Sequence, residues 1–157
     1  MQDPPVTRRL AAILAADVAG YSRLVAADEE ATLRTLGAYR TTIADLAAEH
    51  GGRIFGTAGD SVMIEFASAV QAARSAVAIQ RALKRYNDDL PSERRLEFRI
   101  GINLGDVVAE RGDLLGDGVN VAARVQEIAP PAGICLTGAM AEQASTTSAS
   151  WRSASGC

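Results

Sequence analysis

The sequence is poor in cysteine, has no long apolar run and carries no excess of basic charge. The two cysteines among 157 residues, Cys135 and Cys157, show no ligand-like spacing, so we expect neither a disulfide framework nor a zinc site. The apolar stretch near the start, Leu10 to Ala16, has seven residues, whereas a membrane-spanning helix needs roughly 20. These shortages predict a cytoplasmic protein with no membrane partner.

The charge balance excludes a further class of partner. The chain has 16 Lys and Arg against 19 Asp and Glu, a formal net charge of −3 at pH 7, and the two signs are mixed along the sequence. We therefore expect no nucleic-acid partner, and an anionic small molecule would need a metal ion. A hydrophobic content of 48% over this length is typical of one globular domain whose core needs no disulfide or metal.

Apolar patterning predicts an α+β fold. Short or alternating apolar runs indicate strands over residues 10–18, 53–55, 61–66, 96–102 and 134–137, with Val107–Val108 pairing back after a turn at Gly105. Helical spacing indicates helices from Asp28 to Gly51, from Ser68 to Asp88 and from Val119 to Ile128. This order matches the ferredoxin-like βαββαβ arrangement, an antiparallel sheet with the long helices on one face.

The two ends of the chain differ from the middle. We expect residues 1–9 to form an N-terminal segment and residues 10–140 to form the domain. In residues 141–157, 11 residues are Ser, Thr or Ala and no apolar period is visible. This composition predicts a disordered tail.

Two aspartates are the first candidates for a functional site. Asp17 ends the first expected strand, and Asp60 lies at the tip of the hairpin between the second and third strands. Taken alone, each aspartate would be interpreted as a residue that only helps to form a turn. The ferredoxin-like topology makes strands one and three neighbours, so the two carboxylates should converge at one edge. Such a pair can hold Mg²⁺, which takes its remaining ligands from water and substrate phosphates.

A second constellation lies on the third expected helix. Asn120 and Arg124 are four residues apart and so share one helix face, from which both could reach a substrate. Without other evidence they would be polar residues of a surface helix. The flanking Ala122 and Ala123 indicate that this helix packs closely against a neighbour.

These blocks together resemble the class III nucleotidyl cyclases, the catalytic domain of adenylate and guanylate cyclases. The resemblance runs from about Ala11 to Gly138 and consists of the turn region Ala16 to Ser22, the hairpin Gly56 to Phe66, the strand Phe98 to Val108, and Asp113 to Val125 followed by Pro131 to Ile134. It implies a homodimer with composite active sites that converts a nucleoside triphosphate to a 3′,5′-cyclic nucleotide and pyrophosphate for signal transduction.

The resemblance also implies a role for each candidate residue. Asp17, Asp60 and the backbone of Val18 would hold two Mg²⁺ or Mn²⁺ ions per site. The turn of Ala19, Gly20, Tyr21 and Ser22, together with Gly59, would cradle the substrate phosphates. Asn120 and Arg124 of the other subunit would orient the ribose and stabilise charge on the α-phosphate.

Base selection is only half specified. The family position seven residues before the Asn is Asp113, whose carboxylate can accept from an adenine amino group, so ATP is the expected substrate. The position that carries Lys in many adenylate cyclases is Gly56, which has no side chain. A guanylate cyclase and a catalytically impaired nucleotide-binding or dimerising regulatory module remain alternatives. A diguanylate cyclase does not fit, because its Gly-Gly-Asp/Glu-Glu-Phe turn is absent and Asn120 and Arg124 would have no role.

The end of the sequence departs from the family. Members continue into a final pair of strands, one of which brings a basic residue to the phosphates. From Ala144 onward this chain offers no such strand pattern and only Arg152 as a cation, which indicates a truncated or frameshifted end. We therefore expect low turnover compared with a complete relative.

Overall fold

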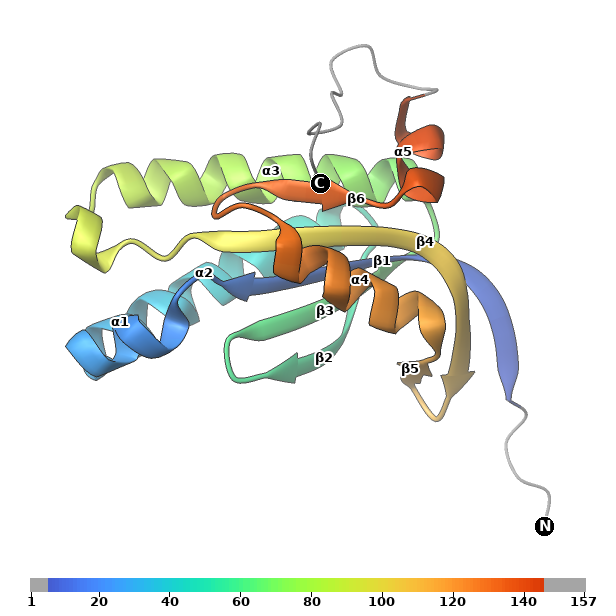
Figure 1. Cartoon of the computed structure of the whole chain (residues 1–157), viewed down its shortest axis with the longest axis horizontal. Helices are drawn as coiled ribbons and strands as arrows, with labels where there is room; N and C mark the ends of the chain where they lie inside the picture. Colours follow the sequence, from blue (N-terminus) through green and yellow to red (C-terminus); the bar gives the residue numbers. More distant parts are fainter. Residues whose placement is uncertain (1–5, 146–157) are drawn as a thin grey trace.

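The computed structural model describes residues 6–145, and its elements follow the expected βαββαβ order with additions (Figure 1). Its strands are β1 (Thr7–Val18), β2 (Arg53–Ala58), β3 (Ser61–Phe66), β4 (Phe98–Glu110), β5 (Asp113–Leu115) and β6 (Ile134–Leu136). Its helices are α1 (Tyr21–Ala27), α2 (Glu29–Glu49), α3 (Ala69–Asp88), α4 (Asp117–Ile128) and α5 (Gly138–Ser145), with a 3-10 turn at Ser92–Arg94. In this described part of the chain, no helix has the length and apolar character of a membrane span.

The sheet order places the two aspartates at one end. Within the described residues six strands form one sheet in the order β2-β3-β1-β4-β5, and β6 pairs in parallel with β4. β1 pairs antiparallel with both β3 and β4, so the predicted neighbourhood of strands one and three is confirmed. The end of β1 and the turn between β2 and β3 therefore lie at the same end of the sheet, as Figure 1 shows.

Local sequence signals set the starts of both long helices. Asp28 caps α2, since its side chain accepts a hydrogen bond from the backbone N–H of Ala31 at 3.0 Å. Ser68 caps α3 in the same way, accepting from the N–H of Gln71 at 3.2 Å. The expected helix starts at these residues are therefore confirmed.

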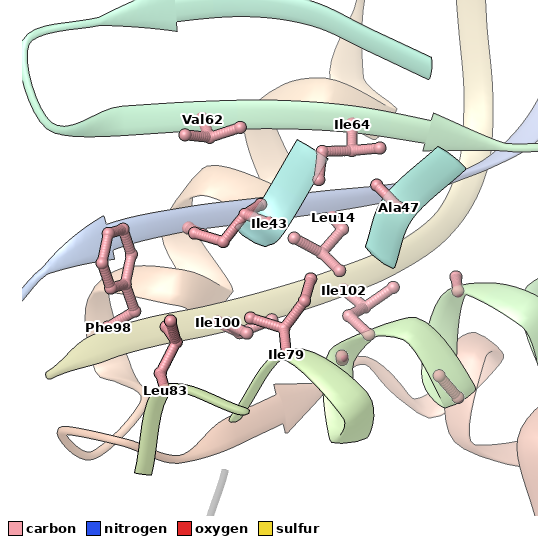
Figure 2. Packing of buried hydrophobic residues seen from close by; sticks show 14 of the residues in the cluster. Leu14, Ile43, Ala47, Val62, Ile64, Ile79, Leu83, Phe98, Ile100 and Ile102 are labelled. Carbon is pink, nitrogen blue, oxygen red and sulfur yellow. The ribbon is translucent and has the colours of Figure 1, made fainter. Parts of the chain in front are cut away.

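The two faces of the sheet are covered by different helices. Even-numbered residues of β1, such as Leu14, pack with α2 and α3 in the main core, where Ile43 and Ile79 lie close together (Figure 2). Odd-numbered residues of β1, such as Ile13, pack with Ala122 of α4 in a smaller cluster on the opposite face. This division follows from the alternation of side chains along a strand. The long helices share one face as predicted, while α4 lies on the other face.

The expected turn at Gly105 does not exist. β1 has 12 residues and pairs with β4 without interruption from Val18 opposite Phe98 to Thr7 opposite Ala109. Val107 and Val108 therefore continue the same strand. The chain reverses later, at Arg111 and Gly112, whose φ angles of 51° and 85° are positive. The three residues that follow form the short strand β5. Long-range pairing with β1 outweighs the local tendency of a glycine to end a strand.

Two helices were not expected from the sequence. α1 begins at Tyr21, inside the segment interpreted as a turn, and α5 extends from Gly138 to Ser145. Met140 and Ala144 of α5 are buried in the main core, so Ala141–Ser145 is helical and not part of a disordered tail. The rest of the expected tail, residues 146–157, lies outside the described residues, as do Arg152 and the proposed aberrant end.

Candidate active site

Asp17 and Asp60 meet at the end of β1. The Oδ2 atom of Asp60 accepts a hydrogen bond from the backbone N–H of Val18 at 2.8 Å, so the tip of the β2–β3 hairpin is tied to the residue after Asp17. Asp60 also raises the pKa of Asp17 by charge repulsion, which requires the two carboxylates to be near neighbours. The predicted convergence of the two acids is therefore present in a single chain.

Asp17 is held by two further side chains. Arg99, its Cα partner across the β1–β4 pair, forms an ion pair with Nη2 3.2 Å from Oδ1. Gln126 of α4 donates from Nε2 to the same Oδ1 at 2.5 Å. The pKa of Asp17 is nevertheless raised, chiefly because burial disfavours its charged form, while Arg99 and Gln126 act in the opposite direction. The charged form of Asp17 therefore loses favourable solvation through burial, and a bound cation would offset this loss.

Two glycines allow α4 to lie directly on β4. A Cβ atom at Gly101 of β4 would lie 2.2 Å from the backbone nitrogen of Gln126. At the other end of the helix, a Cβ at Gly118 would lie 2.5 Å from the carbonyl oxygen of Asp106. Buried Asn103 adds a hydrogen bond from Nδ2 to the Gly118 carbonyl at 3.1 Å. These contacts fix the axial position of α4 and thereby the position of Gln126 beside Asp17.

Asn120 and Arg124 lie on the exposed side of α4. At 100° per residue, Arg124 is displaced by about 200° from Gln126 around the helix and by about 40° from Asn120. Both side chains are exposed, and within the described residues neither forms a side-chain hydrogen bond or ion pair. The predicted pair therefore shares a face, but that face points away from the chain's own Asp17.

The expected phosphate turn is the start of α1. Gly20 has a left-handed φ of 65° and is the N-cap residue of the helix. The N–H of Ala19 already donates to the carbonyl of Glu97 at 2.8 Å, which leaves the amides of Gly20, Tyr21 and Ser22 as the candidates for an anion. The Tyr21 side chain packs against the main core. Gly59, with a φ of 57°, completes the turn that presents Asp60.

The two positions assigned to base selection lie on adjacent elements. Asp113 begins β5 and is exposed, and Gly56 lies in β2 just after a bulge. Arg53 of β2 donates to the carbonyl of Gly112 at 3.2 Å, which joins β2 to the residue before Asp113. A Cβ at Gly56 would lie no closer than 3.8 Å to the nearest side-chain atom, so the backbone there has room for a side chain.

The donor set suits a hard divalent cation. Asp17 and Asp60 offer carboxylate oxygens, and the described residues contain no cluster of three or more His, Cys, Asp or Glu. A closed protein cage is therefore absent from this part of the chain. Mg²⁺ and Mn²⁺ are commonly bound by one or two carboxylates together with water and substrate phosphates, so the pair fits an open site of this kind.

Comparison with known proteins gives the family. A profile of the adenylate and guanylate cyclase catalytic domain matches residues 7–153. The chain belongs to this family. It is 47% identical over 138 residues to putative adenylate cyclase 3 of Rhizobium meliloti (strain 1021), covering 87% of this chain and 24% of that protein. It is 37% identical over 139 residues to an adenylate cyclase of Streptomyces coelicolor, covering 88% and 35% respectively.

Solved structures agree with the sequence relatives. The adenylate/guanylate cyclase/hydrolase from Silicibacter pomeroyi superposes with a TM-score of 0.84 at 42% identity, covering 91% of this chain and 83% of that one. The guanylyl cyclase Cya2 superposes with a TM-score of 0.78 at 26% identity, covering 88% and 79%. The chain spans about a quarter to a third of the length of the two curated relatives above, 24% and 35%.

Sequence reasoning missed two residues whose side chains contact Asp17. In the sequence, Arg99 is one of the polar residues that alternate with apolar ones, and no pattern singles out Gln126. The signal for Arg99 was available only with the β1–β4 register, which places it opposite Asp17. The signal for Gln126 was Gly101, whose missing side chain lets α4 approach β4.

Proposed function

We propose that this cyclase domain is an adenylate cyclase that converts ATP to 3′,5′-cyclic AMP and pyrophosphate for signal transduction. The observation that carries this proposal is the convergence of Asp17 and Asp60 beside the start of α1. The curated relatives named adenylate cyclase, at 47% and 37% identity, support the choice of reaction. ATP as the substrate assigns the proposed reaction to the cytoplasm.

The active site is proposed to form between two copies of the chain. One copy supplies Asp17 and Asp60 at its β1 end, with the Val18 backbone as a further ligand and the start of α1 for the phosphates. The partner supplies Asn120 and Arg124, which point away from their own Asp17 and have no side-chain partner in the described part of the chain. A homodimer then contains two such composite sites, related by two-fold symmetry.

The chemistry is an in-line displacement at the α-phosphorus. Two divalent ions held by Asp17 and Asp60 would neutralise phosphate charge and favour ionisation of the ribose 3′ hydroxyl, whose proton passes to water. Asp17 and Asp60 hold this charge at the end of β1, and the amides of Gly20, Tyr21 and Ser22 bind phosphate oxygens. Asn120 orients the ribose and Arg124 stabilises charge on the α-phosphate. The 3′ oxygen bonds to the α-phosphorus, the bond to the bridging oxygen breaks, and pyrophosphate leaves.

Asp113 favours adenine over guanine. Its carboxylate accepts from the adenine 6-amino group, whereas guanine presents a carbonyl oxygen at that position and would meet two acceptors facing each other. Gly56 supplies no second contact to the base. We therefore expect ATP to be preferred but discrimination against GTP to be smaller than in a cyclase with a side chain at this position.

The test is cyclic nucleotide formation by the purified chain with Mn²⁺ and either ATP or GTP. Cyclic AMP from ATP, lost in Asp17→Asn, supports the proposal. Preferential use of GTP would identify a guanylate cyclase. Binding of ATP without release of pyrophosphate would identify a regulatory module and overturn the proposal.

A further inference from the structure

A buried asparagine connects the helix that carries Asn120 and Arg124 to the start of a second helix. Asn103 of β4 is 6% exposed. Its Nδ2 donates to the carbonyl of Gly118 in the first turn of α4 at 3.1 Å. Its Oδ1 accepts from the hydroxyl of Thr137, the residue before α5, at 2.9 Å. Both ends of the side-chain amide therefore have a partner, one at the start of α4 and one at the start of α5.

Thr137 fixes the second end of this connection. Its hydroxyl oxygen accepts from the backbone N–H of Met140 at 3.4 Å, and its carbonyl accepts from that of Ala141 at 2.9 Å, so Thr137 caps α5. Its own N–H donates to the carbonyl of Ile102 in β4 at 3.1 Å, and Met140 is buried in the main core. The start of α5 is therefore anchored, and Asn103 ties the start of α4 to this anchor.

Close packing around Asn103 opposes a shift of the helix start. A Cβ atom at Gly105 would lie 2.8 Å from Nδ2 of Asn103 and 3.4 Å from the Cα of Gly118. The strand, the amide and the first turn of α4 are thus in direct contact. A buried amide that loses its hydrogen-bond partner costs free energy, so the bond between Asn103 and Gly118 resists movement of the helix away from β4.

The start of α4 is the end that governs Asn120. Gly118 is two residues before Asn120, and Gly116, the N-cap residue of α4, gives the helix no side-chain hydrogen bond. The other end is held where Gln126 donates to Asp17. Loss of the contact at Gly118 would therefore tilt the helix about its held end and displace Asn120 more than Gln126. A displacement of about 1 Å in an active site can cost about 100-fold in rate.

We propose that Asn103 is a positioning residue that sets Asn120 and Arg124 for catalysis. The inference rests on the proposed function, because it concerns the composite site of the same reaction. Asn103 acts through the α4 helix of its own chain. It therefore serves the site to which its chain contributes Asn120 and Arg124, and it does not serve the site to which its chain contributes Asp17 and Asp60.

The first test is amide hydrogen exchange of the full chain without metal or nucleotide. Asn103→Leu removes both hydrogen bonds while keeping a side chain of similar volume. We expect the amides of residues 117–124 to exchange about tenfold faster than in the wild type, because the helix start loses its support from β4. The amides of β3, on the far side of β1, should keep their wild-type exchange.

Asn87→Leu is the matched control for this measurement. Asn87 of α3 is 8% exposed, accepts from the hydroxyl of Tyr39 and donates to the carbonyl of Leu96 at 3.0 Å. It therefore makes the same two kinds of hydrogen bond as Asn103, but on the face of the sheet that α4 does not cover. Asn87→Leu should leave the exchange of residues 117–124 unchanged.

Mixed dimers give a second measurement that a general loss of stability would not reproduce. Paired with Asp17→Ala, Asn103→Leu supplies the acids to a site that receives Asn120 from the other chain, so activity should equal that of Asp17→Ala paired with wild type. Paired with Arg124→Ala, one site lacks Arg124 and the other receives a displaced Asn120. Activity of that dimer should be about tenfold lower or less.

Faster exchange in α4 of Asn103→Leu alone, together with this difference between the two mixed dimers, supports the proposal. Unchanged exchange in α4, equally faster exchange in β3 or in Asn87→Leu, or equal activity of the two mixed dimers overturns it. If Asn103→Leu does not unfold cooperatively, Asn103→Ala is measured in its place. A wild-type chain that forms no cyclic nucleotide would contradict the proposed function, and hydrogen exchange alone then decides whether Asn103 holds α4.

Discussion

Asp60 reaches across from the β2–β3 turn and accepts a hydrogen bond from the backbone N–H of Val18 at 2.8 Å. This contact occupies one carboxylate oxygen of Asp60 and joins two elements separated by 42 residues in the sequence. It connects folding and catalysis, because the same carboxylate that fastens the hairpin tip is proposed to bind metal. The two roles can be separated by substitution.

Asp60→Asn should keep the hairpin contact and lose the catalytic charge. The amide oxygen of Asn can still accept from Val18, so we expect the free energy of unfolding to change by less than about 1 kcal/mol. Turnover with Mn²⁺ should fall by about 100-fold or more, because a neutral amide oxygen would hold a divalent ion more weakly than a carboxylate does. Cyclic AMP formation and urea denaturation, measured on one preparation, check both expectations.

Asp28→Asn is the matched control for that substitution. Asp28 caps α2 outside the site, and Asn is an equally good cap, so activity should persist. Wild-type turnover by Asp60→Asn would remove Asp60 from the proposed metal site.

Mixed dimers should recover activity that neither parent has. Asp17→Ala lacks the metal acid and Arg124→Ala lacks the partner's arginine, so each homodimer has two defective sites. In a mixed dimer one of the two sites receives both intact residues, so the purified mixed dimer should have about half of wild-type activity. The measurement is cyclic AMP formation after co-expression with two different affinity tags and purification of the doubly tagged dimer.

No recovery in the doubly tagged dimer would contradict a site shared between chains. Asp17→Ala mixed with wild type provides the reference, because those dimers keep one complete site under the same purification.

Gly101→Ala should destabilise the domain by displacing α4. Its Cβ would lie 2.2 Å from the backbone nitrogen of Gln126, a contact that only a shift of the helix can relieve. We expect a loss of about 3 kcal/mol or more in the free energy of unfolding. Chemical denaturation followed by circular dichroism measures it.

Gly37→Ala is the matched control for the glycine prediction. Gly37 lies inside α2, and a Cβ there meets nothing within 4 Å. The change should stabilise the helix by about 0.5–1 kcal/mol, because Ala loses less backbone entropy than Gly. Equal destabilisation by both substitutions would mean that close approach of α4 to β4 is not what Gly101 provides.

Glu65 should contribute stability that depends on pH. It pairs with Arg9 and Arg53 across three strands, at 2.5 and 2.6 Å, and its side chain is 13% exposed. Burial raises the pKa of Glu65, but the hydrogen bonds and charges of the two arginines outweigh burial and hold it below the ordinary value of 4.5. Because the folded pKa is depressed, the stabilisation is present above that ordinary value and is lost as pH falls through the folded pKa.

Glu65→Gln therefore should cost about 1 kcal/mol at pH 7 and much less at pH 3. Urea denaturation of both proteins at the two pH values gives the difference. A cost that stayed the same at pH 3 would show that the charge of Glu65 is not the source of its contribution.

Gly56→Lys should sharpen the choice of base. The position has no positive φ and has 3.8 Å to the nearest side-chain atom, so β2 should accept the new side chain without strain. If Gly56 is the empty adenine-reading position, Lys donates to a ring nitrogen and raises the ratio of ATP to GTP turnover by about tenfold. Competition assays with both nucleotides measure the ratio, and an unchanged ratio would remove Gly56 from base recognition.

The sequence alone predicted the long helices and their caps, most of the strands and the two candidate acids. The side chains of Asp28 and Ser68 accept hydrogen bonds from backbone N–H groups three residues away. Alternation of apolar residues along β1 is also a local property. The helix caps and this strand could therefore be predicted without knowledge of the fold. The convergence of Asp17 and Asp60 could also be predicted, because few sheet topologies are compatible with the βαββαβ order of elements. Asn120 and Arg124 share a face for the equally local reason of helical spacing.

Only the tertiary structure decided how these elements meet. The uninterrupted β1–β4 pairing carries β4 past Gly105 and sets Arg99 opposite Asp17, and the approach of α4 to Gly101 brings Gln126 to the same carboxylate. Strand register and helix position are fixed by contacts between residues up to 109 positions apart, such as Asp17 and Gln126. The periodicity of the local sequence cannot predict such contacts, because their energy arises from packing and strand pairing that exist only once the chain has folded.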